Sequence, residues 1–324
     1  MKPIILAWLF AAGALLTARA QSPLADFARR DTSVHDPSTI VRCAGEYWLF
    51  ATGRGIVSRH SKDLKHWEAG PLVFSNVPAW TTNTIHANHG HFWAPDVFAA
   101  TNGYFLYYAV SSWGKRDSVI GLATNATLDP TSASYHWTDC GPVIRTTEND
   151  DYNAIDPAAL RTPEGQLWLA FGSYWSGIKL IELNPETGRR IREESPIFPL
   201  AHHDSIEASY IYFHDDYYYL FVNWGQCCRG AKSTYNIRLG RSKDVIGPYL
   251  DKEGHDLLHD GGTLFLQTQG EFIGPGHAGI IVANGADFLS CHFYDGSRGG
   301  LPTLGILPLR WDAEGWPEAQ GPAQ

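Results

Sequence analysis

A pattern that recurs five times along the chain constrains its fold more than any other feature of the sequence. In each copy a short apolar segment leads through a turn to a strand rich in aromatic residues. Each copy begins with a motif of three residues, and the aromatic strand begins nine residues after the middle residue of that motif. The five middle residues are Asp36, Ala94, Asp156, Glu207 and His277. Unrelated hairpins would not be expected to share one offset, so the pattern indicates a single structural unit repeated along the chain.

After several copies of the pattern, a third and a fourth short strand can be placed in the sequence. Long stretches with helical periodicity are hard to find. Successive middle residues are 58, 62, 51 and 70 residues apart. Fourth strands are expected at 65–68, 135–137 and 247–249. Repeated four-stranded units of this length are typical of a β-propeller. The sequence therefore predicts an all-β fold, a five-bladed β-propeller, with residues 21–324 forming one domain without a linker.

The first twenty residues have the pattern of a secretory signal peptide. Lys2 provides a positive start, residues 4–16 are an apolar run, and Ala18-Arg19-Ala20 has the small-x-small form of a cleavage site. Thirteen apolar residues are too few to span a bilayer comfortably. We therefore expect residues 1–20 to be a signal peptide, and the mature protein to be secreted or periplasmic and not bound to a membrane.

The charge balance argues against a nucleic-acid partner, because such partners require basic patches. The chain has 25 Lys and Arg against 34 Asp and Glu, a net charge of −9. Removal of Lys2 and Arg19 with the signal peptide changes this to −11. Aromatic residues make up 13% of the chain, which suits a fold of many strands or a ligand that stacks on rings. A monomer is expected for a closed propeller.

The five cysteines are an odd number, so at least one is free or pairs between chains. Cys227 and Cys228 are adjacent. They are expected to lie half-buried in a turn, and a disulfide between them that lines a pocket is the alternative.

The repeat also predicts where chemistry takes place. The first strand of each blade lines the central channel of a propeller, so equivalent positions on these strands converge. These positions carry Asp36, Asp156, Glu207 and His277. Carboxyl groups brought together against an apolar wall should have pKa values that are pushed apart. General acid–base catalysis at neutral pH needs such a pair.

At these residues the sequence resembles glycoside hydrolase family 43, and within it the endo-1,5-α-L-arabinanases. The resemblance covers essentially all of the mature chain. It rests on five ordered motifs, which are His35-Asp36-Pro37-Ser38-Thr39-Ile40, His91-Phe92-Trp93-Ala94-Pro95-Asp96, Asn153-Ala154-Ile155-Asp156-Pro157, Ile206-Glu207-Ala208, and Cys227-Cys228-Arg229-Gly230 followed by Ser233-Thr234-Tyr235. The family fold is a five-bladed propeller, which agrees with the fold that the repeat predicts.

The resemblance implies roles for the three acids. Asp36 matches the general base that activates water, and Glu207 matches the general acid that protonates the leaving oxygen. Asp156 matches the acid that orients Glu207 and raises its pKa. The family inverts anomeric configuration, so the carboxyl groups of Asp36 and Glu207 should lie roughly 6.5–9.5 Å apart. His277 matches a histidine near a buried ion, usually calcium, whose other ligands are mainly water.

Several residues are expected to bind substrate. Trp93 should face the cleft and stack on a sugar ring, with His35 at the border of the same subsite. Asn153, Ser173 and Trp175 are candidates for hydrogen bonding and stacking. The implied partners are arabinan and arabino-oligosaccharides.

Two kinds of alternative remain open at this point. Relatives with the same acids act as exo-acting α-L-arabinofuranosidases or β-xylosidases, and loop heights around the cleft decide between them. A sugar-binding propeller without catalysis is the alternative of another class, and the presence of all three acids disfavours it.

Overall fold

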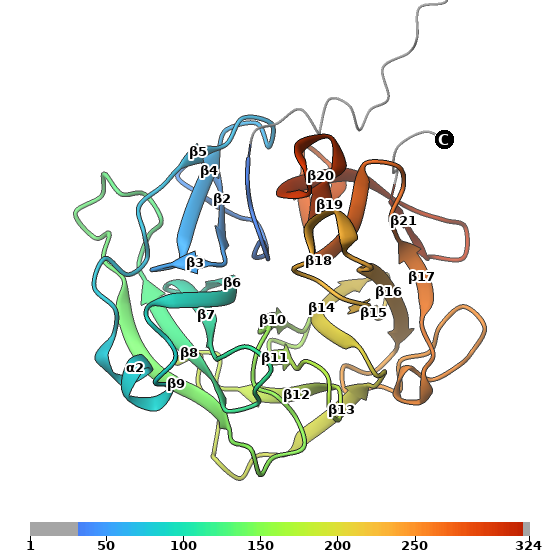
Figure 1. The fold of residues 1–324 in the computed structure, drawn as a ribbon, viewed down its shortest axis with the longest axis horizontal. Helices are drawn as coiled ribbons and strands as arrows, with labels where there is room; N and C mark the ends of the chain where they lie inside the picture. Colours follow the sequence, from blue (N-terminus) through green and yellow to red (C-terminus); the bar gives the residue numbers. More distant parts are fainter. Residues whose placement is uncertain (1–31, 320–324) are drawn as a thin grey trace, which may run out of the picture.

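The computed structural model describes residues 32–319, and the predicted signal peptide lies outside this part of the chain. Five antiparallel sheets are arranged around a central axis (Figure 1). Each of the five repeats in the sequence corresponds to one sheet, so the prediction of a five-bladed β-propeller is confirmed.

The blades follow the chain in order. Blade 1 consists of β1 (Val41–Cys43), β2 (Glu46–Ala51), β4 (Val57–Ser61) and β5 (Glu68–Ala69). Blade 2 consists of β6 (His91–Ala100), β7 (Gly103–Val110), β8 (Ser118–Asn125) and β9 (Thr138–Thr146), and β3 (Gly53–Arg54) pairs with β6. Blade 3 consists of β10 (Ala158–Arg161), β11 (Leu167–Phe171), β12 (Ile178–Leu183) and β13 (Ile197–Ala201).

The last two blades have the same order of strands. Blade 4 consists of β14 (Ile206–His214), β15 (Tyr217–Trp224), β16 (Asn236–Ser242) and β17 (Thr263–Leu266). Blade 5 consists of β18 (Phe272–Ala283), β19 (Ala286–Asp295), β20 (Leu301–Trp311) and β21 (Pro317–Ala319). The helical segments are short, and they are α2 (Ala79–Thr84), η1 (Gly230–Lys232), η2 (Leu257–His259) and η3 (Gly296–Arg298). Among residues 32–319 there is no helix with the length and apolar character needed to cross a membrane.

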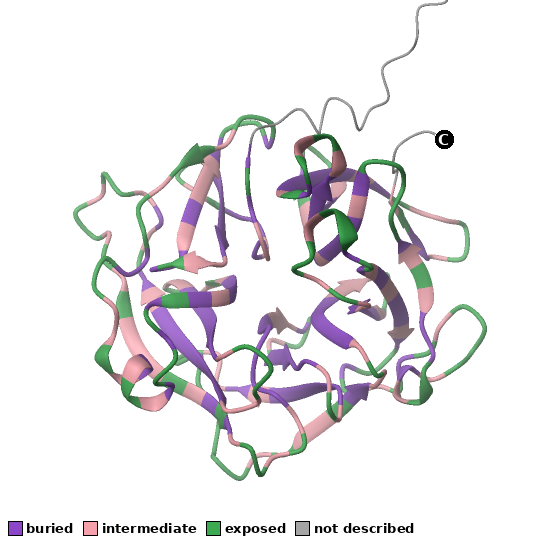
Figure 2. Ribbon diagram, in the orientation of Figure 1, coloured by how far each residue is buried: buried purple, intermediate pink, exposed green. Residues whose placement is uncertain are grey.

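The hydrophobic core lies between neighbouring blades. In strand β2, Tyr47 and Leu49 pack against blade 5, whereas Trp48 and Phe50 belong to a cluster shared with blade 2. Successive side chains of a strand point to opposite faces, so a strand covered on both faces needs an almost continuous apolar run. This explains why the aromatic strands carry no polar alternation. Buried residues fill the strands, and exposed residues lie mostly in the loops (Figure 2).

In each blade a residue with positive φ, here called the inner bend, lies within the first strand or in the segment just before it. These residues are Asp36 (φ 49°), Ala94 (φ 40°), Asp156 (φ 55°), Ala208 (φ 52°) and His277 (φ 61°). Non-glycine residues rarely adopt this conformation. In blades 2, 4 and 5 the bend coincides with a shift in register between the inner strand and its partner.

In blade 4 the position of the bend shows that the predicted repeat was misaligned by one residue. The residue of blade 4 equivalent to Asp36 is Ala208, and Glu207 stands one position earlier. The β14–β15 hairpin turns at Asp215 and Asp216, both with positive φ, so strand β15 begins at Tyr217 and not at Asp216 as predicted. Glu207 is therefore equivalent to Trp93 and Gly276, the last paired residues before the register shift in their own blades.

Neighbouring side chains hold four of these bends. The backbone N–H groups of Asp36, Ala94, Ala208 and His277 donate hydrogen bonds to four different side chains. The acceptors are His292 Nδ1 (3.2 Å), Thr52 Oγ1 (2.8 Å), Asp156 Oδ2 (3.1 Å) and Asn223 Oδ1 (2.9 Å), respectively. Each acceptor lies in the preceding blade around the ring, so the inner bends are tied from blade to blade.

The predicted fourth strands were less accurate. Strand β5 begins at Glu68 and β9 at Thr138, both later than expected. The prediction of a strand at 247–249 is wrong, because blade 4 is completed by β17 (Thr263–Leu266). A loop closed by η2 lies between them, and its turn signals hid the edge strand.

Candidate active site

A cavity of about 1090 Å³ lies among the residues at the inner bends of the blades. Its lining includes eight of the nine residues predicted from the sequence, and these are His35, Asp36, Trp93, Asn153, Asp156, Ser173, Trp175 and Glu207. The ninth, His277, is not part of the lining. It lies behind Asp36, with Nδ1 3.7 Å from Asp36 Oδ1. The three acids are thus brought to one site.

Asp36 is held as an anion. His35 Nδ1 lies 2.8 Å from Asp36 Oδ2, and Thr52 Oγ1 donates a hydrogen bond of 2.6 Å to the same oxygen. Burial raises the pKa of Asp36, but the charge and hydrogen bond of His35 outweigh it, so this pKa lies well below its ordinary value. Burial lowers the pKa of His35, and Asp36 more than compensates, raising it to about 10. The two groups therefore form an ion pair.

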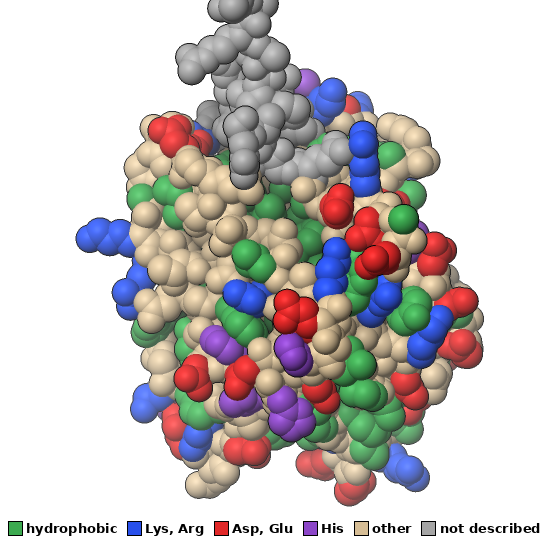
Figure 3. Space-filling view, turned by 90° about the vertical axis from the view of Figure 1, so that its right-hand side faces the viewer, with side chains coloured by type: hydrophobic (Ala, Val, Ile, Leu, Met, Phe, Trp, Pro, Cys, Tyr) green, Lys and Arg blue, Asp and Glu red, His purple; other side chains and the backbone are tan. Residues whose placement is uncertain are grey.

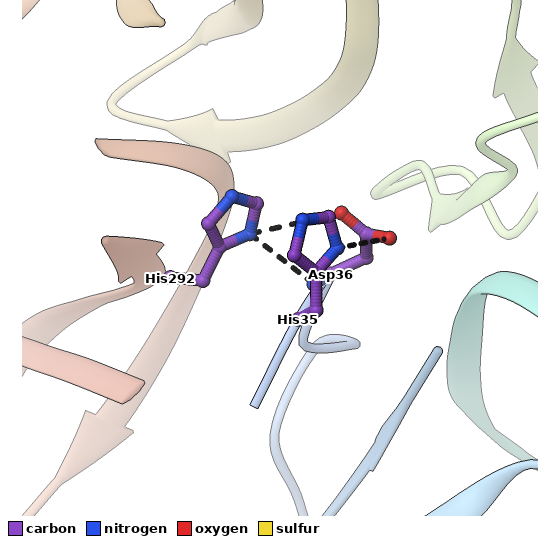
Figure 4. Close-up of side chains that lie close together, drawn as sticks. All are labelled: His35, Asp36 and His292. Carbon is purple, nitrogen blue, oxygen red and sulfur yellow. Dashed lines mark hydrogen bonds and ion pairs between the residues drawn. The ribbon is translucent and has the colours of Figure 1, made fainter. Parts of the chain in front are cut away.

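A second layer of side chains supports this pair. The ring of His292 stacks on His35 with 4.4 Å between centroids, and His292 Nδ1 accepts the backbone N–H of Asp36 (Figure 4). His35 Nε2 lies 2.9 Å from Tyr294 Oη. Both supporting residues belong to β19, so blade 5 positions a carboxylate of blade 1.

Glu207 has a different environment. It is buried, its Oε2 accepts a hydrogen bond of 2.8 Å from Ser173 Oγ, and its Oε1 accepts one from the hydroxyl of Tyr235. Burial raises the pKa of Glu207, the two hydroxyl groups oppose this, and the charge of Asp36 adds to the increase. The net direction is upward, which favours a carboxyl group that keeps its proton.

Asp156 is the third acid. Burial, together with the charges of Glu207 and Asp36, raises its pKa well above the ordinary value. Its Oδ2 accepts the backbone N–H of Ala208, the residue that follows Glu207. Asp156 therefore fixes the backbone from which Glu207 projects.

The walls of the cavity are aromatic. Trp93 and the exposed Trp113 meet edge to face, with 6.4 Å between ring centroids. The guanidinium group of Arg116 lies over the ring of Trp175, 5.7 Å from its centroid. Trp175 also lines a second, more open hollow of about 540 Å³ that contains Lys179 and His202. Trp175 therefore lies at the border of the two hollows.

The carboxylate of Asp36, beside His277, is an oxygen ligand of the kind that calcium prefers. Among residues 32–319, the three side chains placed to share an ion are His35, Asp36 and His292, whose ligand atoms lie within 4.8 Å of one another. Calcium takes six to eight oxygen ligands, and this set offers two imidazole rings and one carboxylate that are already bonded together. A calcium ion here fits only when most of its ligands are water, which is the arrangement that the resemblance implies.

Sequence reasoning missed several residues of the site. Three of them lie on or just after the second strand of a blade: Thr52 follows β2, and His292 and Tyr294 lie on β19. The tertiary fold brings them to Asp36 and His35. Tyr235 lies within one of the motifs that carried the resemblance, but no role had been assigned to it. The thiols of Cys227 and Cys228 are free, and both residues line the cavity.

The charged side chains on the face drawn in Figure 3 are of both signs. Acidic side chains and those of Lys and Arg are interspersed there, and several histidines lie among them (Figure 3). The loop before β17 contributes ion pairs, such as Lys252 with Asp312 at 3.1 Å.

Comparison with known proteins decides the family. The sequence model described as "Glycosyl hydrolases family 43" matches residues 31–317. The chain belongs to glycosyl hydrolases family 43. It is therefore a glycoside hydrolase by family, and its five-bladed propeller and acidic cavity are consistent with that membership.

Relatives within the family carry two kinds of name. A Cellvibrio japonicus protein named extracellular exo-alpha-(1->5)-L-arabinofuranosidase is 40% identical, over 89% of this chain and 87% of its own. A Bacillus subtilis protein named extracellular endo-alpha-(1->5)-L-arabinanase 1 is 36% identical, over 95% of this chain and 94% of its own. A solved structure of a Cellvibrio cellulosa alpha-L-arabinanase complexed with arabinohexaose matches with a TM-score of 0.85 and 40% identity, over 89% of this chain and 96% of that one.

Proposed function

We propose that this protein is a secreted endo-1,5-α-L-arabinanase that hydrolyses arabinan by a single displacement with inversion of configuration. The observation that carries the proposal is the contrast between two carboxyl groups of one cavity. Asp36 is paired with His35 and kept ionised, whereas the pKa of the buried Glu207 is raised. An inverting glycosidase needs one carboxylate as base and one carboxylic acid as proton donor.

The reaction follows from these protonation states. Asp36 takes a proton from a water molecule, and the oxygen of that water attacks the anomeric carbon. Glu207 gives its proton to the glycosidic oxygen as the bond to the leaving sugar breaks. After one turnover Asp36 is protonated and Glu207 is ionised, so both must exchange a proton with solvent before the next cycle.

Positioning is the role we assign to Asp156. Its bond to the Ala208 N–H holds the segment that carries Glu207, and Ser173 and Tyr235 hold the carboxyl group itself. Placement of a proton donor within a fraction of an ångström matters, because misplacement of catalytic groups by about 1 Å can cost about 10²-fold in rate.

The substrate follows from the cavity walls and the relatives. Trp93, Trp113 and Trp175 offer ring faces for sugars, and we assign His35 and Asn153 to the polar contacts of the same subsites. The protein carries excess negative charge, which suits a neutral polysaccharide better than a polyuronate. The names of the relatives and the arabinohexaose complex support arabinan as the polymer, and the word extracellular in two of those names supports secretion.

Exo action is the second candidate, since the relative from Cellvibrio japonicus bears an exo-acting name at 40% identity. The two modes differ in whether a long chain can extend beyond both sides of the acids. The hollow beyond Trp175 supports endo action, because a chain that passes Trp175 has room to continue.

Calcium belongs to the proposal as well. His277 is the residue we assign to a largely hydrated calcium ion behind Asp36. When bound, the ion would supply positive charge that favours ionised carboxylates. Isothermal titration of metal-free protein with calcium tests the assignment, and His277→Ala should abolish the binding while the Cys140→Ser control retains it.

The product time course on linear and branched arabinan tests the function. Mixed arabino-oligosaccharides should appear first from linear arabinan with the wild type. Glu207→Gln should lose this release, whereas Glu253→Gln, which removes an exposed acid far from the cavity, should not. Arabinose as the first and sole product would move the protein to the exo class. Binding of arabinan without any release by the wild type would overturn the hydrolase proposal.

A further inference from the structure

The thiol of Cys228 lies in the catalytic cavity and next to the ion pair that holds Asp36. Its Sγ is 3.7 Å from His35 Nε2, and the backbone N–H of Cys228 donates a hydrogen bond of 2.6 Å to Tyr294 Oη. Tyr294 Oη in turn lies 2.9 Å from the same His35 nitrogen. One ring nitrogen of His35 thus faces the thiol while the other faces the carboxylate of Asp36.

This environment is that of a reactive cysteine and not of a structural one. Cys228 is exposed and lines the cavity. Its Sγ lies beside the ring of His35, which is paired with Asp36. A thiolate beside a cationic histidine is the reactive form of cysteine. In contrast, burial raises the pKa of Cys291 to about 12, so that thiol stays protonated.

Cys227 is placed to complete the reaction. It precedes Cys228 directly and lines the same cavity. Redox-sensor cysteines are exposed and stand next to a second cysteine that resolves the first oxidation product. We propose that Cys227 and Cys228 form a reversible oxidation site for peroxides, and that its oxidation slows hydrolysis in the adjoining active site.

The chemistry balances in two steps. The Cys228 thiolate attacks one oxygen of a peroxide, the S–O bond forms, the O–O bond breaks, and hydroxide leaves, which gives a sulfenic acid. Cys227 then attacks the sulfur of that sulfenic acid with loss of its own proton. The S–S bond forms, the S–O bond breaks, and water leaves. Two thiols are oxidised by two electrons, and one peroxide is reduced.

Oxidation would disturb the active site through the backbone. The Cα atoms of adjacent residues are about 3.8 Å apart, closer than the roughly 4.4–6.8 Å usual for a disulfide. Closing the ring therefore shifts residues 227 and 228. The Cys228 N–H then leaves Tyr294, and the contact between the Cys228 thiol and His35 is lost. A strained disulfide of this kind is also easily reduced, which makes the change reversible.

The test uses the full-length mature protein with hydrogen peroxide as the probe. Intact mass and peptide mapping report oxidation directly, and hydrolysis of linear arabinan reports its effect. We expect the wild type to lose two hydrogens on the peptide that contains residues 227 and 228. We also expect its rate to fall about tenfold and to recover with dithiothreitol, since the disulfide is accessible and strained. A preceding incubation with arabino-oligosaccharide should slow the oxidation, because Cys228 lines the cavity.

Cysteine variants separate the roles of the two thiols. Peroxide should leave the activity of Cys228→Ser at the value measured for that variant before treatment. Cys227→Ser should gain oxygen at Cys228 and recover poorly, because no second thiol is present to resolve the sulfenic acid. Cys140→Ser, a change in the outer strand of blade 2, should behave as the wild type. If the peptide that contains residues 227 and 228 stays unmodified in peroxide, the proposal is overturned. This readout does not depend on whether any form of the protein hydrolyses arabinan. Full oxidation without a change in rate would overturn its regulatory part.

Discussion

The carboxyl group of Asp156 accepts a hydrogen bond of 3.1 Å from the backbone N–H of Ala208. Ala208 is the residue with positive φ at the inner bend of blade 4, and Glu207 directly precedes it. One acid of the cavity thus fixes the chain that carries another, across the boundary between blades 3 and 4.

Replacement of Asp156 tests this relationship. In Asp156→Ala the N–H of Ala208 loses its acceptor, and the carboxyl group of Glu207 is free to move. We expect kcat to fall by about 10²-fold or more with little change in KM, because the loss concerns orientation and not substrate binding. Asp204→Ala, which removes an exposed acid, is the matched control. A rise in KM at constant kcat would contradict the role.

The acid limb of the pH profile should depend on His35. In the wild type the pKa of Asp36 lies well below its ordinary value because of His35, so the base stays ionised as the pH falls. His35→Gln removes the positive charge, and the pKa of Asp36 should then rise. The acid limb of kcat/KM should move to higher pH, and activity should decline already near pH 4–5, about the ordinary range of a carboxyl group. An unchanged acid limb would show that another group controls it.

The alkaline limb should depend on Tyr235. The hydroxyl group of Tyr235 lowers the pKa of Glu207 against the effect of burial. Tyr235→Phe removes that hydrogen bond, so the pKa of Glu207 should rise and the alkaline limb should move to higher pH. The maximal rate should also fall, because one contact that orients the acid is gone. Tyr212→Phe, remote from the cavity, should leave both limbs in place, and a downward shift in Tyr235→Phe would contradict the argument.

Asp96 should make the stability of the fold depend on pH. It is buried in blade 2, and its two carboxyl oxygens accept the N–H groups of Thr39 and Ala159, each at 2.9 Å. Burial outweighs these bonds and raises the pKa of Asp96 to about 6. A carboxyl group with a raised pKa binds its proton more tightly in the folded state, so its contribution to stability is present at low pH and is lost as the pH rises through about 6.

Chemical unfolding at pH 4 and pH 7.5 measures this contribution. Relative to Asp96→Asn, the wild type should lose about 2.5 kcal/mol of unfolding free energy between the two conditions. The variant should be less stable than the wild type at pH 4, since a side-chain amide leaves one of the two backbone N–H groups without an acceptor. A constant difference between the two proteins across the range would refute the pH argument.

Trp175 should matter more for long substrates than for short ones. Its ring lies at the border of the catalytic cavity and the neighbouring hollow. Trp175→Ala should raise KM for arabinohexaose more than for arabinotriose, because the longer chain crosses the border. Trp113→Ala is the comparison, since Trp113 meets Trp93 on the other wall. Equal effects on both oligosaccharides would place Trp175 within a single subsite.

The blades were predictable from the sequence because the aromatic second strand of each blade is buried on both of its faces. Tyr47 and Trp48 serve different cores, so the strand has a continuous apolar run that stands out from the turns around it. The short edge strand β17 gave no such signal. The sequence also did not show that Ala208, and not Glu207, is the residue at the bend of blade 4, an offset that arises from the hairpin at Asp215 and Asp216.

The acids themselves were also predictable, but their partners were not. Asp36 lies at a position of the repeat, so its place near the axis follows from the fold. His292 is 256 residues away from it in the sequence, and Tyr294 is 259 residues away from His35. Neither lies on an inner strand, and no spacing within the chain indicates that they meet the residues of blade 1. Only the closed ring brings them together.

The closure of that ring has a consequence for how the enzyme matures. The sheets of blades 1 and 5 have no strand in common. The two blades are joined by the hydrophobic core between them and by an isolated β-bridge between Ser33 and Thr303. The side chains that support Asp36 lie on β19, near the end of the chain. A ribosome therefore makes Asp36 among the first residues of the domain, and the side chains that support it among the last. The contacts between blades 1 and 5 can form only after the fifth blade has been synthesised, so hydrolysis depends on the closed ring in which the first blade meets the fifth.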